Sequence, residues 1–495
     1  MRLYDSMSQE KKEFVPRDGD HVTMYFCGPT VYNYIHVGNA RPYVVSMVAK
    51  RYFQSLGYRV TLVENITDID DRIIRKGNAE GRSAREVAEE FAQAYRDDTD
   101  RLGLGRADVE PLATEHIQEI IDLIVGLVAR GHAYQSGPDV YFDVGSWPGY
   151  GRLSNQQVAE MRHGARIELG EDKADPLDFA LWKGAKPGEP AWDSPWGPGR
   201  PGWHIECSAM SLKYLGTGFD IHGGGRDLIF PHHENEIAQA EAALGEPFAR
   251  FWMHNGMLNL REEKMSKSLG NTLTLRQVLD EHRPEVLIAA FLGSHYRSPL
   301  EFSAELLEET EQQMERLRNV FRGLADRAGA TADDADGIAA TAGAVAAAGA
   351  AGAPIIGGAA APAADRAEAL LGRVALRRQA FAEALADDLN TAAALAEVFG
   401  LAREVNAAMA AEPMSAETSR RIRTEMGEMA HILGLDALSG GEDAIPADIV
   451  AMAQERRQSR ADHDFARADA LRAAITERGY EVRDVSGGFK IVATR

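Results

Sequence analysis

Near its start the chain alternates between apolar runs of strand length and apolar positions at helical spacing. Val22 to Cys27 (VTMYFC) is typical of a buried strand, and Gly28-Pro29 after it is a turn signal. Asn39 to Leu56 has the apolar period of a helix that stops at Gly57, and Val60 to Val63 predicts a second strand. Strand, turn, helix and strand in this order predict a βαβ unit with a parallel sheet, in which ligands bind beyond the carboxyl ends of the strands.

The middle of the chain predicts an insertion into this fold. Thr114 to Arg130 has one apolar stripe and predicts an amphipathic helix, and Asp139 to Val144 (DVYFDV) predicts a strand. The stretch from there to Gly202 is rich in Gly, Pro and Trp, which indicates the insertion itself. Phe219 to Ile221 then resumes the strand pattern, and Pro231 to Leu244 resumes a helix.

From Ser303 onward the pattern becomes helical. Ser303 to Arg327 and Arg366 to Ala411 both have strong helical periodicity. Between them, Ala328 to Ala364 is almost entirely Ala, Gly, Thr and Asp with two prolines, so it has little apolar bulk to bury and predicts a flexible insertion. Ser439 to Pro446 predicts a linker to a small final module.

Composition narrows the class of protein. The chain has 495 residues, of which 45% are apolar, and no run approaches the length of a transmembrane helix. The first fifteen residues have no apolar secretory core, so we expect a cytoplasmic protein. Two cysteines exclude a disulfide scaffold. The net charge of -21 argues against nucleic-acid binding by the chain as a whole, but Ala447 to Arg495 has nine basic and eight acidic residues (9 − 8 = +1), which permits an RNA-facing module.

The sharpest motif is Lys264 to Ser268 (KMSKS). Two lysines in a surface loop are common, but in this string they can also neutralise the charge on a departing pyrophosphate. A second motif, Gly28 to Asn39 (GPTVYNYIHVGN), places His36 and Gly38 at the start of the predicted helix. Gly38 lets the backbone approach a ligand, and helix N-termini bind phosphate, so the pair of motifs indicates an ATP site.

At these two motifs the sequence resembles the class I aminoacyl-tRNA synthetases, whose HIGH and KMSKS signatures flank one ATP site. The chain departs from HIGH at Val37 and Asn39, and Asn39 donates hydrogen bonds without carrying charge. The resemblance implies that magnesium accompanies ATP and that His36, Asn39, Lys264 and Lys267 are catalytic. It also implies that ATP is bound by Gly28, Thr30, His36, Gly38, Asn39 and Lys267.

Two further stretches narrow the family. Gly199 to Met210 (GRPGWHIECSAM) and Phe219 to Gln239 (FDIHGGGRDLIFPHHENEIAQ) resemble the cysteinyl-tRNA synthetases. The resemblance implies one zinc ion per chain, bound by Cys27, Cys207, His232 and Glu236. Thiolates with imidazole favour zinc, with a carboxylate as a harder fourth ligand.

The residues alone leave these roles open. Two cysteines 180 positions apart are more often core residues, and His and Glu four positions apart are more often a surface pair. The same family resemblance implies that Thr67, Trp203 and Asp227 contact the substrate cysteine. Their alternative roles are structural: a helix cap for Thr67, a core residue for Trp203 and a turn residue for Asp227.

The resemblance implies a cysteine-activating enzyme. We expect it to form cysteinyl-adenylate from ATP and L-cysteine, to transfer the cysteine to tRNA(Cys), and to be a monomer. Two alternatives stay open: a ligase that joins cysteine to an amino sugar in mycothiol synthesis, and a non-catalytic RNA-binding factor descended from a synthetase. The first is a shorter protein, whereas this chain continues through Asp387 to Asn406 and Arg456 to Gly479; the second predicts a damaged ATP site.

The expected fold is α/β. It has a Rossmann-type parallel-sheet catalytic domain with an inserted connective subdomain, followed by an all-α bundle and a small C-terminal module. The predicted boundaries are 1–115 and 200–260 for the catalytic domain, 116–199 for the inserted subdomain, 261–310 for the KMSKS region that contacts the tRNA stem, 311–438 for the bundle with its insertion at 328–364, and 447–495 for the anticodon-binding module.

Overall fold

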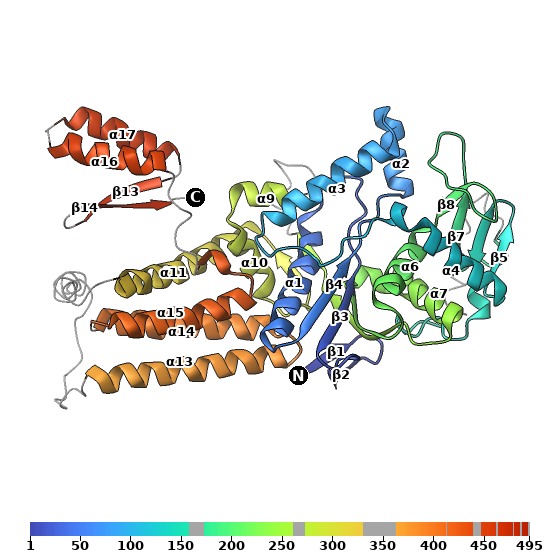
Figure 1. The fold of residues 1–495 in the computed structure, drawn as a ribbon, viewed down its shortest axis with the longest axis horizontal. Coiled ribbons are helices and arrows are strands. Elements are labelled where there is room, and N and C mark those ends of the chain that lie inside the picture. The colour runs from blue at the N-terminus through green and yellow to red at the C-terminus, as the bar shows by residue number, and fades with distance from the viewer. Residues whose placement is uncertain are drawn as a thin grey trace.

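The computed structural model describes most of the chain (Figure 1). The described residues are 1–157, 173–260, 273–329, 363–411, 413–438, 447–461, 464–478, 480–485 and 488–493. The predicted lysine motif at 264–268 and nearly all of the predicted alanine-rich insertion lie outside them.

A parallel sheet forms the centre of the molecule, as the hydrophobic pattern predicts. Its strands lie in the order β10-β9-β3-β4 and all pairs are parallel. The strands are β3 (His21–Phe26), β4 (Arg59–Glu64), β9 (Phe219–Gly225) and β10 (Ala249–Asn255). Helix α1 (Ala40–Ser55) connects β3 to β4, so the predicted βαβ unit is confirmed.

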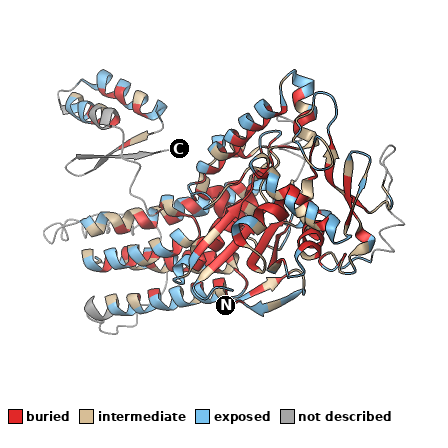
Figure 2. Ribbon diagram, turned by 45° about the vertical axis from the view of Figure 1, so that its right-hand side comes forward, coloured by how far each residue is buried: buried red, intermediate tan, exposed pale blue. Residues whose placement is uncertain are grey.

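The sheet is buried on both faces, and Figure 2 shows its strands as the core of the molecule. This explains why β3 and β4 have nearly continuous apolar runs instead of an alternating pattern. The sequence pattern missed β10 and several helices, three of which lie between β4 and β9 in the chain. These three helices are α2 (Asp71–Glu80), α3 (Ala84–Asp100) and α6 (Trp203–Leu215).

A second sheet lies to one side of the first (Figure 1). It is antiparallel, in the order β5-β6-β7-β8, with strands β5 (Ala133–Ser136), β6 (Asp139–Phe142), β7 (Phe179–Gly184) and β8 (Gly199–Pro201). Helix α4 (Ile117–Ala129) follows a short 3-10 turn, η2 (Ala113–His116), and accounts for the predicted amphipathic helix. The sheet shares an apolar core with α6 and with α7 (Glu234–Leu244), so it is packed firmly beside the central sheet.

Helix α7 begins three residues later than predicted. The preceding segment, η5 (Ile229–His233), is a distorted turn because Phe230 has an extended backbone (φ -134°, ψ 132°). The chain therefore changes direction before the regular helix starts, which brings His232 onto the same face as the first turn of α7.

Four helices form a bundle that extends from the central sheet (Figure 1). They are α11 (Ala304–Gly329), α13 (Ala363–Ala386), α14 (Thr391–Ala411) and α15 (Ala416–Ile432). The periodic stretch from Arg366 to Ala411 is two helices, because Asp388 and Leu389 have left-handed backbones (φ 66° and 48°) that end the first one.

Short elements join the bundle to the sheet. They are the N-terminal strands β1 (Arg2–Asp5) and β2 (Glu10–Glu13), the helices α9 (Leu275–Glu281) and α10 (Pro284–Leu292), and the strands β11 (Leu258–Leu260) and β12 (Leu300–Phe302). β11 and β12 pair in parallel.

The last part of the chain is a small unit with its own core. It consists of α16 (Ala447–Ala461), α17 (Phe465–Glu477) and the antiparallel hairpin of β13 (Tyr480–Val485) and β14 (Gly488–Ala493). Ile449, Ala453, Ile475 and Val482 are its buried centre. None of the described helices in the molecule combines the length and apolar composition that crossing a bilayer requires.

Candidate metal centre and nucleotide site

The four predicted metal ligands meet at one point. One donor atom from each of Cys27, Cys207, His232 and Glu236 lies within 4.8 Å of all the others. They come from four places in the chain: the residue after β3, the second turn of α6, the end of η5 and the first turn of α7. The fold therefore brings together two cysteines that are 180 positions apart.

Glu236 is at the centre of this group. Its Oε1 lies 3.4 Å from Cys27 Sγ and 3.1 Å from His232 Nε2, and the Glu236 side chain has no exposed surface. Cys207 and His232 are buried too, whereas Cys27 is only partly covered. Donor atoms at such mutual distances can surround a single ion, and a buried carboxylate needs a cation or several hydrogen bonds to be stable.

Burial sets the protonation states of these ligands. It raises the pKa of the Cys27 thiol well above its usual range and also raises the pKa of Cys207. Burial lowers the pKa of His232 far below its usual value, so this imidazole is neutral. A neutral imidazole is ready to bind a metal, but both thiols must lose a proton first.

A second histidine orients the first. His204 Nδ1 lies 2.9 Å from His232 Nδ1, so a proton on His232 Nδ1 can be donated to His204. This tautomer leaves His232 Nε2, which faces Glu236, with a free lone pair. His204 itself is held edge-on against Phe179 of β7, so the second sheet supports the metal ligands.

The residues fit a zinc ion. Two thiols, one imidazole nitrogen and one carboxylate oxygen are donors that zinc accepts, and four of them match its usual coordination number. A second set of four, Cys27, His222, His233 and Glu236, also has its donor atoms within 4.8 Å of one another. It shares two members with the first set and has one thiol fewer, so we favour the first set for zinc.

Sequence reasoning missed the histidines around this centre. His222 Nε2 lies 2.8 Å from Glu236 Oε2, and the His222 ring stacks on Trp252 with 4.5 Å between the ring centroids. His233 Nδ1 lies 2.8 Å from His254 Nε2. The one available signal was the apolar, strand-like setting of His222 in the sequence FDIHGGG, where a histidine must face other buried groups.

Two of the three predicted cysteine contacts lie beside this centre. The Trp203 ring lies over His232 with 4.3 Å between ring centroids. Thr67 is buried and donates a hydrogen bond from Oγ1 to Glu206 Oε2 at 2.9 Å. Asp227 is exposed on the short turn η4 (Arg226–Leu228), between β9 and η5, so its carboxylate reaches solvent.

Arg72 is a neighbour of the site that no sequence pattern signalled. Its guanidinium lies between the rings of Tyr32 and Trp203, at 5.2 and 5.5 Å from their centroids. It also donates a hydrogen bond to Thr30 Oγ1 at 3.0 Å, so it connects the predicted ATP-binding segment to the predicted cysteine pocket.

The predicted phosphate-binding turn has a different geometry from the one expected. Val37–Asn39 is a short 3-10 turn, η1, and α1 begins only at Ala40. His36 Nδ1 accepts a hydrogen bond from Gly38 N at 3.0 Å, which leaves the proton of a neutral imidazole on Nε2, free to be donated to a ligand. Burial lowers the pKa of His36, which favours this neutral form.

Gly38 and Gly28 are each required for a different steric reason. A Cβ on Gly38 would lie 3.1 Å from the His36 ring, so a side chain there would crowd the histidine. A Cβ on Gly28 would lie 1.8 Å from the carbonyl oxygen of Asn65. Gly28 is therefore required by the close approach of the two loops that follow β3 and β4, whether or not it contacts ATP.

Lys264 and Lys267 lie outside the described residues, but both flanks of their segment are close to His36. Leu258 of β11 lies 3.5 Å from the Cβ that Gly38 would carry. On the other flank, Val37 N donates to Leu273 O at 2.9 Å, and Leu275 N donates to Ile35 O at 2.9 Å. The segment that contains the lysines therefore leaves and returns beside the His36–Asn39 turn.

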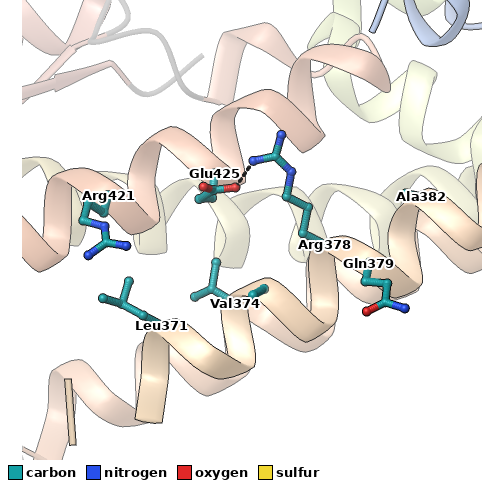
Figure 3. Close-up of a pocket in the computed structure, with 8 residues that line it drawn as sticks. Leu371, Val374, Arg378, Gln379, Ala382, Arg421 and Glu425 are labelled. Atoms are coloured by element: carbon teal, nitrogen blue, oxygen red, sulfur yellow. Dashed lines mark hydrogen bonds and ion pairs between the residues drawn. The ribbon is translucent and has the colours of Figure 1, made fainter. Parts of the chain in front are cut away.

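A separate hollow lies far from these residues, in the helical bundle between α13 and α15 (Figure 3). Its volume is about 500 Å³, and it is lined by Leu371, Val374, Ala375, Arg378, Gln379, Ala382, Arg421 and Glu425. None of the predicted site residues lines it, and Arg378 is paired with Glu425 across it. We assign it no part in the site.

Comparison with known proteins gives consistent matches along the chain. Residues 13–312 match the family described as tRNA synthetases class I (C) catalytic domain, and residues 380–438 match the DALR domain. The cysteine–tRNA ligases of Caldicellulosiruptor saccharolyticus and Desulfitobacterium hafniense are 43% and 46% identical to it, each over 99% of both chains. A methionyl-tRNA synthetase of Mycobacterium tuberculosis, solved with methionyl-adenylate, shares the fold with a TM-score of 0.58 at 16% identity, over 85% of this chain and 91% of that one.

Proposed function

The chain belongs to the cysteine–tRNA ligase family of class I aminoacyl-tRNA synthetases, and we propose that it activates L-cysteine with ATP and transfers the cysteine to tRNA(Cys). The observation that carries this proposal is the meeting of two thiols, an imidazole and a carboxylate within 4.8 Å after β3, the strand that also leads into a turn suited to phosphate. The first group suits a sulfur-containing substrate and the second suits a nucleotide.

Zinc at Cys27, Cys207, His232 and Glu236 would supply affinity for a thiolate that a serine hydroxyl cannot match. Cysteine and serine differ by one atom, and a pocket that sorts by shape alone separates such isosteres poorly. Trp203, which lies on His232, covers the side of the pocket next to this ligand. The Thr67 hydroxyl donates to Glu206 and accepts from Asn65, so it keeps one lone pair for the substrate ammonium group.

The first step is attack of the cysteine carboxylate on the α-phosphate of ATP, which releases pyrophosphate. Magnesium would accompany the ATP. His36 donates from Nε2 to a phosphate oxygen, Asn39 donates from its exposed amide, and Lys264 and Lys267 neutralise the pyrophosphate. Thr30 and Gly38 form the walls of the nucleotide site. The protein works by positioning and charge stabilisation.

In the second step a ribose hydroxyl of the terminal adenosine of tRNA(Cys) attacks the activated carbonyl, and AMP leaves. We assign the rest of the tRNA to the bundle, which contains the DALR match, and to the unit built on α16 and α17. The protein acts as a cytoplasmic monomer in this proposal, and Asp227 contacts the substrate ammonium from the edge of the pocket.

The decisive experiment separates the two steps. The purified protein should catalyse exchange between ATP and pyrophosphate that depends on cysteine and not on serine, and it should charge tRNA(Cys). Exchange without charging, together with ligation of cysteine to an amino sugar, would favour the mycothiol-type ligase. Absence of both reactions in a folded, zinc-loaded protein would favour a non-catalytic RNA-binding factor.

A test of the residue roles uses metal content. The wild-type protein should contain about one zinc per chain. Cys27→Ser and Glu236→Gln should each reduce this content, while Lys213→Gln, a surface change on the same helix as Cys207, should leave it unchanged. Retention of zinc by both ligand variants would disprove the assignment of the site.

A further inference from the structure

The turn between α13 and α14 is built around a buried aspartate. Asp388 has no exposed surface and a left-handed backbone (φ 66°), which an aspartate tolerates better than most residues do. Figure 1 shows this end of α13 beside the N-terminal strands, at the base of the bundle. A buried carboxylate in an unfavourable backbone conformation persists only where the surrounding structure holds it firmly.

Asp388 is held by two segments that are distant in sequence. Its Oδ1 accepts hydrogen bonds from Tyr4 N at 2.8 Å and from the Tyr296 hydroxyl at 2.9 Å. Its Oδ2 accepts from Arg297, at 2.8 Å from Nε and 2.7 Å from the second guanidinium nitrogen. Its backbone N donates to Arg2 O at 2.9 Å. One side chain therefore joins the bundle to strand β1 and to the segment that follows α10.

That segment leads directly to the nucleotide site. Tyr296 O accepts a hydrogen bond from Gly256 N at 2.8 Å, just before β11, whose Leu258 lies next to Gly38 of the His36–Asn39 turn. Arg41, buried in the first turn of α1, donates to the carbonyls of Gly256 and Ser298 at 2.8 Å each. The residues that hold Asp388 are thus held in turn by the helix that follows the His36–Asn39 turn.

A second contact holds the bundle at another point. Arg51 on α1 donates to His431 O, near the end of α15, at 2.8 Å and is paired with Asp436. The bundle also shares an apolar core with the catalytic part, but apolar packing is not directional, so these polar contacts are the ones that define its angle and loss of one would let it tilt. Helix α13 has 24 residues and is about 36 Å long, so a tilt of about 10° would move its far end by about 6 Å.

We infer that Asp388 is a positioning residue for the transfer step: it fixes the angle of the helical bundle so that a tRNA bound there presents its terminal adenosine to the adenylate. This inference rests on the proposed function. Misplacement of a reacting group by about 1 Å is enough to reduce a rate about 100-fold, so a tilt of the bundle would impair transfer. Amino acid activation requires no contact with the bundle, and Arg41 still holds the segment beside the nucleotide site, so we expect activation to change much less than transfer.

The test compares Asp388→Asn with Asp387→Asn in the full-length, zinc-loaded protein. Asparagine retains the shape and the left-handed backbone but loses the charge that pairs with Arg297. Asp387 is an exposed neighbour that pairs with Lys11, so its substitution is a matched control. Cysteine-dependent ATP–pyrophosphate exchange, steady-state charging of tRNA(Cys) and thermal melting are measured for each variant.

For Asp388→Asn we expect exchange within about twofold of wild type and a fall in the kcat of charging of between tenfold and 100-fold, with KM for tRNA little changed. Asp387→Asn should match wild type in both reactions. Equal charging by a folded Asp388→Asn protein would overturn the inference, and so would an equal fall in exchange and charging, because that is the result of general destabilisation.

If Asp388→Asn does not fold, Arg297→Lys decides, since it keeps the charge but loses the paired donors. A reduced ratio of charging to exchange in this variant supports the inference, and an unchanged ratio overturns it. A wild-type protein with no cysteine-dependent exchange would refute the proposed function, and this inference with it. Wild-type activity combined with unaffected variants would refute this inference alone.

Discussion

The predicted phosphate-binding turn and one ligand of the predicted metal centre, Cys27, follow the same strand, β3, yet the two sites differ in burial. Cys207, His232 and Glu236 are buried among aromatic rings and further histidines. His36 is partly covered and Asn39 is exposed. The proposed centre for sulfur is already assembled and all its candidate ligands except Cys27 are buried, whereas the proposed turn for phosphate is open.

This difference follows from what each site must do. To separate cysteine from serine, a site needs donors at fixed distances and no water to compete with the sulfur. To admit ATP and release pyrophosphate, a site must stay accessible and apply its charge only when the phosphates are present. Between Cys27 and His36, Gly28 is required because the loop after β3 packs directly against Asn65, in the loop after β4.

We expect the largest effect when a ligand is removed from the proposed zinc site. Cys207→Ser removes a thiolate ligand, so we expect loss of zinc and a fall of about 1000-fold or more in kcat/KM for cysteine in ATP–pyrophosphate exchange. ATP affinity should stay within about twofold of wild type, because the phosphate turn is separate. Ser211→Ala, a buried change on the same helix, is the control and should keep its zinc. Full exchange activity in Cys207→Ser would contradict the proposal that the buried centre selects cysteine by its sulfur.

Removing a phosphate donor from the open turn should reduce exchange activity less and should leave the zinc bound. His36→Ala removes a donor to phosphate, so we expect exchange to fall about 100-fold. Zinc content should remain that of the wild type. Asn33→Ala, an exposed change in the same loop, should alter exchange by less than about twofold. Loss of zinc from the His36 variant would show that the two sites are not independent.

The pH dependence of zinc binding should report the protonation states of the ligands in the buried site. Burial raises the pKa of both thiols and lowers the pKa of His232, so binding must release two protons from sulfur and none from the imidazole. Zinc affinity should therefore rise between about tenfold and 100-fold for each pH unit from about pH 6 to 8. Competition with a coloured chelator measures it, and an affinity independent of pH would refute these protonation states.

The smallest effect concerns how folding stability depends on pH through one buried carboxyl in the central sheet. Burial raises the pKa of Glu64, at the end of β4, to about 7, and the carboxyl accepts a hydrogen bond from Tyr95. A carboxyl with a raised pKa binds protons more tightly when folded, so its stabilisation is complete at low pH and is lost as pH rises from about 4.5 to 7. The loss at higher pH is about 3 kcal/mol.

Glu64→Gln removes this dependence. We expect the variant to melt a few degrees higher than wild type at about pH 8 and to lose that advantage near pH 5, by differential scanning fluorimetry. Glu90→Gln, an exposed change on α3, is the control and should melt like wild type at both pH values, apart from its surface pairing with Arg82. A variant less stable than wild type at pH 8 would contradict the sign of the shift.

Much of the fold was predictable where a pattern is local. The apolar run of β3, the helical period of α1 and the single stripe of α4 each reflect which faces of one element are covered, and all three elements were found. Helix α6 was missed because it is apolar or buried around nearly its whole circumference, so its sequence has no polar face to reveal the period. The break at Asp388 was missed because nothing in the residues DDLN requires a left-handed turn.

The candidate site likewise contains residues that the sequence predicted and residues that it did not. The four candidate ligands, of which His232 and Glu236 were expected to share a helical face, were predicted from the family resemblance, and so were the glycine and histidine of the phosphate turn. The surrounding residues His204, His222, His254 and Arg72 were not identified, because each acts through a neighbour from another element. Contacts between residues of different elements produce no regular spacing that would reveal them in the sequence.

By itself the sequence determined the elements that have a clear local period, such as β3, α1 and α4, and the chemical groups that are available. Only the tertiary structure decided that Cys27 and Cys207 share one centre, that the flanks of the lysine segment lie beside His36, and that Asp388 joins the bundle to the sheet. The physical reason is the range of the forces. Helical and strand periods arise between residues a few positions apart, while the approach of distant groups depends on the order in which strands pair and helices pack over them.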